Sequence, residues 1–305
     1  MNREPSLSIR IEFFIVRFCE RIFPPRMLRF VLWPLVAFRA WPMFLMFCKH
    51  DWNSPKLPQA LRQRASNMVL TWHKCMIYRY AEIPSMFPDR WGRPHWRRRF
   101  RHEGQEHLIS VRDAGEPSIL ATLHFGSLSV LRCCLRILAI SASQMAFGNG
   151  DMQAAADRKD AYLARVARPC TAPPIFRLDA LREATRFLEA GNTLIICVDT
   201  GVGRQVRGVA GTAALTMASG AIRLSRSTGA RLLPCLIYEE KPWRYVVRIG
   251  TPIPADQPDS EAADALMREF LPVVSEYPEQ YECGPISCWS PADAGKGVGT
   301  GEIGA

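Results

Sequence analysis

The chain has 305 residues, of which 48% are hydrophobic and 22% are charged, and its formal net charge is +10. This composition is typical of a globular chain with ample sequence for a core, so we expect one large domain, or one domain with appendages. The ten cysteines fall at irregular spacings within apolar runs, which excludes a disulfide scaffold and indicates a reducing compartment. Cys283 and Cys288 form a close pair, but nothing nearby completes four zinc ligands, and no metal site is expected.

Residues 1–56 are predicted to form helices that associate with a membrane. Apolar and charged residues alternate in a helical rhythm over 9–22, and residues 27–48 are more apolar still. The second stretch is interrupted by Arg29, Pro34, Arg39 and Pro42. An interfacial or re-entrant helix pair therefore fits better than a single crossing of about 20 apolar residues. A helix hairpin within the domain core is the alternative.

A helix is expected over 57–83, followed by a loop over 84–101 that is rich in proline and arginine. Six arginines of this loop stand around three aromatic residues: Arg90, Arg93, Arg97, Arg98, Arg99 and Arg101 around Trp91, Trp96 and Phe100. Such a patch attracts anionic lipid or another polyanion. A solvated surface loop is the alternative, and nucleic acid is not an expected partner because no binding motif accompanies the charge.

Apolar runs of strand length and helix length then alternate along the chain. Strands are expected over 119–123, 193–198, 231–238 and 244–249, and helices over 128–140, 179–190, 212–228 and 261–277. The alternation predicts an α/β domain over 57–289, with a central mostly parallel or mixed sheet flanked by helices. Residues 290–305, rich in glycine and alanine, are predicted to form a disordered tail.

Two titratable residues directly follow predicted strands. His124 follows strand 119–123, and Asp199 follows strand 193–198. Open α/β sheets place their chemistry outside the carboxyl ends of the strands, so these two side chains are candidates for one site. A lone histidine after a strand can also have a merely structural role. The run Asp199-Thr200-Gly201 also matches the aspartic protease signature, but such enzymes need a second aspartate and an almost wholly β fold.

Several motifs, taken in order, resemble the lipid A biosynthesis acyltransferase branch of the lysophospholipid acyltransferase superfamily. They are Gly-Gln-Glu-His-Leu at 104–108, the segment 119–127 around His124, Arg-x3-Arg-x-Leu-x2-Gly at 182–191 with Val198-Asp199, the glycine-spaced stretch 208–234, and Tyr-Pro-Glu-Gln-Tyr at 277–281. The resemblance covers about residues 10–290 and is most specific over 182–234.

The resemblance implies that His124 deprotonates an acceptor hydroxyl, which then attacks the thioester of an acyl donor while a carboxylate orients the imidazole. It implies acyl carrier protein or acyl-coenzyme A as donor, a lipid-like acceptor, no cofactor, and a peripheral or monotopic location on the cytoplasmic face of a bacterial inner membrane. The substrate-binding candidates, with the arginines as anion contacts, are Phe125, Gly126, Ser127, Ser129, Arg182, Arg186, Arg204, Gly208 and Gly211.

The chain departs from the family pattern His-x4-Asp/Glu, because Ser129 stands at the acidic position. Loss of the orienting acid lowers turnover by about 10⁴ in a serine protease triad, so this departure matters. Asp199 could supply the charge from the second strand, which is the interpretation we favour. Alternatively, Ser129 orients His124 through its hydroxyl or a water molecule. A third possibility is that the protein has lost catalysis and binds lipid or a carrier protein.

Overall fold

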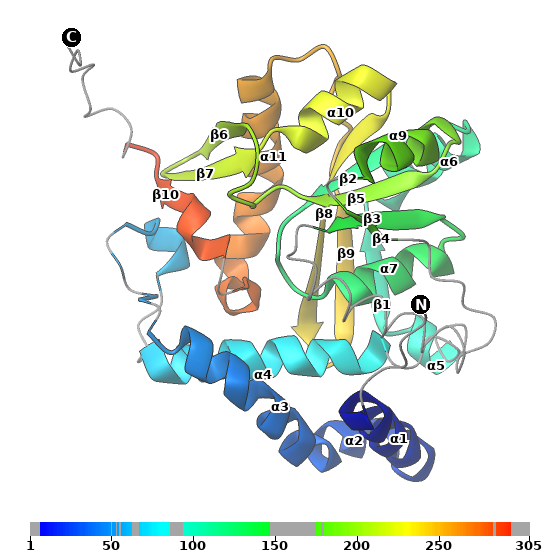
Figure 1. Ribbon diagram of the computed structural model, residues 1–305, viewed down its shortest axis with the longest axis vertical. Coiled ribbons are helices and arrows are strands. Elements are labelled where there is room, and N and C mark those ends of the chain that lie inside the picture. The colour runs from blue at the N-terminus through cyan, green and yellow to red at the C-terminus, as the bar shows by residue number, and fades with distance from the viewer. Residues whose placement is uncertain are drawn as a thin grey trace.

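The computed structural model describes residues 7–49, 51–52, 54, 56–62, 67–85, 94–146, 175–177, 180–282 and 285–293. These residues form a mixed α/β structure in which a central sheet is flanked by helices (Figure 1). The predicted fold class is therefore confirmed for the sheet and its covering helices.

In the described part of the chain, the central sheet has seven strands in the order β1-β9-β8-β2-β5-β3-β4. Their bounds are β1 Phe100–Glu103, β2 Ser118–Thr122, β3 Ala142–Ala146, β4 Ile175–Arg177, β5 Thr193–Cys197, β8 Arg231–Lys241 and β9 Arg244–Ile249. Every neighbouring pair is parallel except β8 and β9, which are antiparallel. β2 and β5 are central and buried along their whole length, which explains their uninterrupted apolar sequences.

Helices cover both faces of this sheet, and alternate residues of β2 point to opposite faces. Ile119 packs in the core that α9 (Leu181–Glu189), α10 (Gly220–Thr228) and α11 (Asp259–Glu276) complete. Leu120 packs in the opposite core with α7 (Leu128–Ile137) and most buried residues of α4 (Asn67–Ser85). Figure 1 shows α9 and α10 above the sheet, α11 beside it and α4 below it. The remaining helical segments of the described domain are α5 Pro94–Arg97, α6 Gln105–Asp113, η1 Gln59–Leu61, η4 Pro278–Gln280 and η5 Pro285–Cys288.

The prediction of a helix over 212–228 is wrong for its first half. Residues Ala213–Ala218 form strand β7, and the helix α10 begins at Gly220. β7 lies between β6 (Gln205–Ala210) and β10 (Trp289–Pro291) in a small antiparallel sheet. Pairing on both edges outweighs the helix preference of its alanines, because tertiary context overrides local propensity. Residues 290 and 291, expected in the tail, belong to β10, whereas 294–305 lie outside the described residues.

Two other predicted boundaries need correction. The helix expected over 57–83 is interrupted, since 59–61 form the short helix η1 and α4 begins at residue 67. The loop expected over 84–101 contains α5 and the start of β1, while 86–93 are not described. In this region Arg101 pairs with Glu103 and Glu240, and Arg99 lies over the ring of Trp243.

The N-terminal segment forms three helices, α1 (Leu7–Ile22), α2 (Pro25–Val31) and α3 (Trp33–Phe47). An ion pair of 2.9 Å between Arg39 and Glu12 joins α3 to α1. Arg29 joins α2 to β8 through Glu239 at 2.8 Å, and its carbonyl accepts the hydroxyl hydrogen of Tyr80 from α4. These contacts attach the helices to the domain. Within the described part of the chain, no helix combines the length and apolarity needed to cross a membrane.

The turn after β2 depends on a glycine. Gly126 has a φ of +63°, and a Cβ at this position would lie 2.0 Å from the carbonyl oxygen of Ile237 in β8. Its N–H donates to the carbonyl of Gln280 at 3.0 Å. The backbone at Gly126 therefore lies in close contact with β8 on one side and with the segment after α11 on the other. A side chain does not fit at this position.

We expect Gly126→Ala to destabilise the fold far more than Gly115→Ala. Gly115 has a similar φ of +67°, but a Cβ there would meet nothing within 4 Å. Gly115→Ala should therefore cost only the left-handed backbone penalty, about 1–2 kcal/mol. Gly126→Ala adds a clash with backbone and should cost roughly 2–5 kcal/mol in total. Chemical denaturation of both variants measures the difference, and equal losses would contradict the steric argument.

Candidate active site

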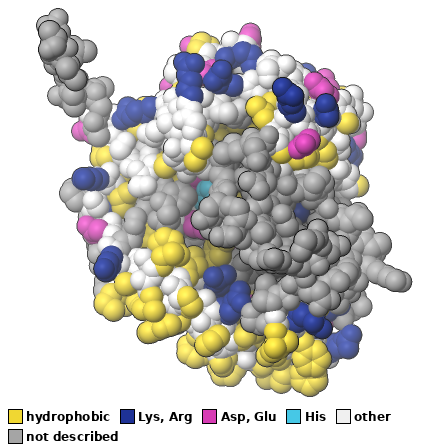
Figure 2. Space-filling model, viewed as in Figure 1, with side chains coloured by type: hydrophobic (Ala, Val, Ile, Leu, Met, Phe, Trp, Pro, Cys, Tyr) yellow, Lys and Arg dark blue, Asp and Glu magenta, His cyan; other side chains and the backbone are white. Residues whose placement is uncertain are grey.

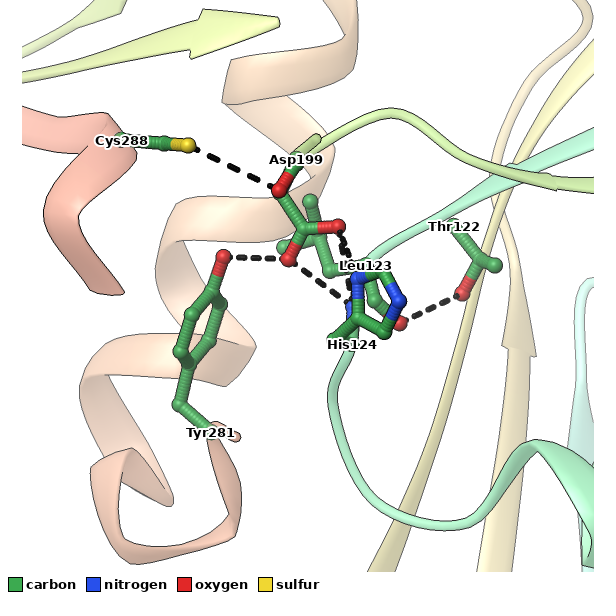
Figure 3. A network of polar contacts seen from close by, with 6 residues as sticks. All are labelled: Thr122, Leu123, His124, Asp199, Tyr281 and Cys288. Atoms are coloured by element: carbon green, nitrogen blue, oxygen red, sulfur yellow. Dashed lines mark hydrogen bonds and ion pairs between the residues drawn. The ribbon is translucent and has the colours of Figure 1, made fainter. Parts of the chain in front are cut away.

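His124 and Asp199 meet at the carboxyl edge of the central sheet (Figure 3). The imidazole Nδ1 lies 2.8 Å from Asp199 Oδ1. The backbone N–H of His124 also donates to the same carboxylate, at 3.1 Å to Oδ1 and 2.9 Å to Oδ2. The carboxylate side chain is 0% exposed, whereas the imidazole is 27% exposed. The acid is thus sequestered while its histidine partner stays accessible.

The sheet register produces this meeting. Thr122, the last residue of β2, pairs with Cys197, the last residue of β5. The N–H of Val198 then donates to the carbonyl of Thr122 at 2.8 Å and extends the pairing past the strand ends. Because parallel strands end at the same edge, the residues two positions beyond each end lie at the same level. The expected neighbourhood of His124 and Asp199 is what the structure contains.

The segment after α11 closes over the carboxylate. The hydroxyl of Tyr281 donates to Asp199 Oδ2, and the thiol of Cys288 lies 3.6 Å from the Asp199 carbonyl oxygen. This segment is bound to the His124 loop by the Glu282 N–H, which donates to the His124 carbonyl at 2.8 Å, and by a bridge between Phe125 and Tyr281. Both oxygens of the carboxylate therefore have fixed partners.

The charges around the imidazole favour its protonated form. Burial lowers the pKa of His124, but Cys197 and Asp199 raise it, and the net result is a pKa above its ordinary value of 6.5. Burial also raises the pKa of the Cys197 thiol, which keeps that thiol neutral near pH 7. Asp199 is the acidic group at hydrogen-bond distance from the ring, 2.8 Å from Nδ1.

The contact to Asp199 also selects a tautomer. When Nδ1–H donates to the carboxylate, Nε2 is left with a lone pair, which is the arrangement of a general base. Figure 3 shows this second ring nitrogen directed away from Asp199. The pair can therefore accept a proton at Nε2 and stabilise the resulting imidazolium.

Four further candidates adjoin His124. Phe125 is fully buried and packs on Tyr281, with ring centroids 6.3 Å apart. Gly126 forms the turn, and the Ser127 hydroxyl accepts the Val130 N–H at 3.4 Å, as a residue that caps the start of α7 would. Ser129 lies in the first turn of α7, and among the described residues no polar contact joins it to His124.

The other substrate-binding candidates lie farther along the chain. Arg182 and Arg186 are exposed on α9, and Arg204 is exposed in the segment after Asp199. Gly208 packs against the backbone of α11, where a Cβ would lie 2.5 Å from the Ala263 carbonyl oxygen, and Gly211 turns the chain between β6 and β7. In the described part of the molecule no polar contact connects these five residues to His124 or Asp199, and their roles stay predictions.

Sequence reasoning missed the side chains that complete the pair, namely Tyr281, Cys197 and Cys288. Tyr281 is the last residue of the motif 277–281, but 82 residues separate it from Asp199 along the chain. Cys197 ends the continuous apolar run of β5, so the sequence does not distinguish it from the core residues beside it. Cys283, the other half of the expected cysteine pair, is not described, and the described residues contain no cluster of metal-ligating side chains.

Asp199→Asn should lower the pKa of His124. The amide carries no charge, so it stabilises the imidazolium less, while the burial that opposes the charged ring persists. The measurement is a pH titration of the imidazole by nitrogen NMR, with His124→Ala used to assign its signals. If the pKa of His124 is the same in the variant as in the parent protein, Asp199 is not its electrostatic partner.

One family comparison covers most of the site described above. The model of the bacterial lipid A biosynthesis acyltransferase family matches residues 75–282, which include His124, Asp199 and Tyr281. A search of curated proteins found no match. The family match extends over about two thirds of the sequence and agrees with the resemblance read from the motifs, so this chain belongs to the bacterial lipid A biosynthesis acyltransferase family.

Proposed function

We propose that this protein transfers a fatty acyl group from an acyl thioester to a hydroxyl or amine of a lipid-like acceptor. Family membership supports acyl transfer in lipid biosynthesis. The observation that carries the proposal is the pair of His124 and Asp199, in which an accessible imidazole is backed by a sequestered carboxylate. The proposed donor is acyl carrier protein or acyl-coenzyme A.

The proposed reaction needs one proton carrier. Nε2 of His124 accepts the proton of the acceptor hydroxyl as the oxygen attacks the thioester carbonyl carbon. The tetrahedral intermediate then collapses, the carbon–sulfur bond breaks, and the imidazolium returns the proton to the leaving thiolate. Asp199 stabilises the imidazolium between the two steps. The products are an acyl ester and a free thiol, so the reaction balances without a redox partner.

Asp199 supports the active interpretation over the inactive one. The inactive alternative rests on the serine at the motif's acidic position, which removes the usual partner of the histidine. Here a carboxylate reaches Nδ1 from β5 instead, at 2.8 Å. Among the described residues, Ser129 makes no comparable contact with His124, so the second alternative, orientation by its hydroxyl, has less support.

The aspartic protease alternative does not fit the fold. Such an enzyme needs two aspartates that share one proton on an almost wholly β framework. Asp199 instead follows a strand of a mostly parallel sheet between helical layers, and its partner is a histidine. We do not propose protease activity.

We further propose that α1, α2 and α3 hold the protein on the cytoplasmic face of a bacterial inner membrane, as a peripheral or monotopic protein. Large apolar side chains are exposed along these helices: Leu7, Ile11, Phe14, Ile15, Phe18, Ile22, Met27, Phe30, Trp33, Phe38, Trp41, Leu45 and Met46. Figure 2 shows hydrophobic side chains gathered along the lower edge of the molecule, where Figure 1 places these helices. Aromatic side chains next to arginines suit an anionic headgroup layer.

A small recess of about 10 Å³, room for about one water molecule, lies beside the site. Its lining includes Met43 from α3 and Ile77 from α4, together with Gly126 and with Tyr281, whose hydroxyl contacts Asp199. The recess therefore lies between the helices with the exposed apolar residues and the proposed catalytic pair.

His124→Ala should abolish acyl transfer and leave vesicle binding unchanged, because the ring is the proposed proton carrier. Asp199→Asn should lower turnover by roughly 10²–10⁴. The assay supplies acyl carrier protein or coenzyme A thioesters with lipid extract and detects, by mass spectrometry, a product heavier by one acyl unit. An active His124→Ala protein would refute the assignment. Absence of product with every thioester from the parent protein, together with measurable lipid or carrier binding, would favour the inactive alternative.

The exposed phenylalanines of α2 and α3 should contribute to membrane binding. Phe30 is 82% and Phe38 is 76% exposed, so their replacement by serine should barely affect folding. Burial of each ring contributes about 1.5–3 kcal/mol, and loss of both should lower partitioning into anionic vesicles roughly 10²–10⁴-fold. Leu181→Ser on α9, 51% exposed, is the matched control. Co-sedimentation with vesicles measures the effect, and equal binding by both variants would contradict the proposed face.

A further inference from the structure

We propose that Tyr281 is a positioning residue that acts on His124 through Asp199. Its hydroxyl donates to Oδ2 of the carboxylate, so that Oδ1 is oriented toward the imidazole. The same hydrogen bond stabilises the negative charge of the carboxylate, so that the imidazole can release its proton. This inference rests on the proposed acyl transfer for its catalytic meaning, although the contact itself can be tested without any turnover.

The phenol is built into the core beside the pair. Tyr281 is 1% exposed, and its ring packs edge-on against Trp289 and tilted against Phe125, with centroids 5.8 and 6.3 Å away. Its hydroxyl donates to Asp199 Oδ2. Burial, followed by the nearby Asp199, raises the pKa of Tyr281 well above its ordinary value, so the phenol keeps its proton and stays a donor.

The backbone of Tyr281 is fixed from two other elements. Lys74 of α4 donates its Nζ hydrogens to the carbonyl of Pro278 and, at 3.5 Å, to that of Tyr281. The Gln280 amide pairs with the backbone of Glu239 in β8, accepting from its N–H at 2.7 Å and donating to its carbonyl at 2.8 Å. The His124 loop is bound to the same segment. These contacts therefore fix the positions of the Tyr281 phenol and the His124 imidazole relative to the Asp199 carboxylate.

The pair needs such a donor because an unshielded buried carboxylate would retain the proton on the imidazole. An imidazole that stays protonated cannot act as a base. The titratable groups that face the pair, among the described residues, are Cys197 from β5, Tyr281 and Glu282 after η4, and Cys288 from η5. Burial raises the pKa of both thiols and keeps them neutral. Apart from His124, Tyr281 is the described side chain that donates to the carboxylate oxygens.

The first test is Tyr281→Phe, which keeps the ring and removes one O–H. Without this donor the carboxylate interacts more strongly with the imidazolium, so the pKa of His124 should rise by about one unit, the size expected for loss of a hydrogen bond to a charged group. Nitrogen NMR titration of the imidazole measures the shift. In an Asp199→Asn background, the same substitution should produce no shift, because its route to the imidazole is gone.

The second test is kinetic. In Tyr281→Phe the acid limb of the pH profile should move upward by the same unit, so that kcat near neutral pH falls about tenfold while KM is unchanged and the rate recovers at higher pH. Tyr277→Phe is the matched control. Tyr277 belongs to the same motif but stacks on Tyr238, with centroids 4.8 Å apart, and should leave both the pKa and the rate unchanged.

A third measurement covers the case in which Tyr281→Phe does not fold. Incorporation of 3,5-difluorotyrosine at position 281 keeps the shape of the ring and makes its hydroxyl a stronger donor. The pKa of His124 should then fall, opposite to the shift in Tyr281→Phe. An unchanged or lowered pKa in folded Tyr281→Phe, or an unchanged or raised one with the fluorinated residue, overturns the proposal. Failure of the parent protein to transfer any acyl group would refute the proposed function alone, because the NMR titration still decides the role of Tyr281.

Discussion

The contact between His124 Nδ1 and Asp199 Oδ1 depends on the parallel pairing of two buried strands. β2 and β5 end in register at Thr122 and Cys197. His124 lies two residues after the end of β2, and Asp199 lies two residues after the end of β5. Hydrogen bonds that hold a sheet together therefore also set the distance between a base and its acid. A slip of one residue in this register would turn one side chain to the opposite face and separate the pair.

The position of the acid distinguishes this chain from the usual motif of its family. An acid five residues after the histidine would come from the first turn of α7, where Ser129 stands and is partly exposed. Asp199 comes instead from a neighbouring strand, and its side chain is completely buried. Burial of a carboxylate is costly unless its oxygens are paired, and here the His124 N–H, the imidazole and Tyr281 pair both of them. An acid at position 199 therefore depends on the segment after α11, whose Tyr281 hydroxyl pairs with one of its oxygens.

The sequence predicted the parts of the site that depend on local patterns. Long apolar runs identified β2, β5, β8 and β9, and the rule that chemistry follows such strands located His124 and Asp199. The sequence did not predict β7, because its alanine-rich stretch suits a helix. Its pairing as a strand depends on β10, in which Trp289 pairs with Leu215, 74 residues earlier in the chain. The contact of Tyr281 with Asp199 spans 82 residues. Neither pairing leaves a periodic signal in one sequence, because each is decided by packing.

A continuous set of contacts joins the exposed N-terminal helices to the buried acid. The rings of Trp41 and Phe44 in α3 pack on Trp72 of α4, at centroid distances of 6.1 and 5.6 Å. Two residues later in α4, Lys74 is 4% exposed, and its charge is compensated by carbonyl oxygens of the segment after α11 and by the ring of Trp52 at 4.2 Å. That segment carries Tyr281 to Asp199. Since a buried ammonium is stable only while these partners stay in place, α4 fixes the segment that carries Tyr281, on the same side on which α3 presents its apolar face.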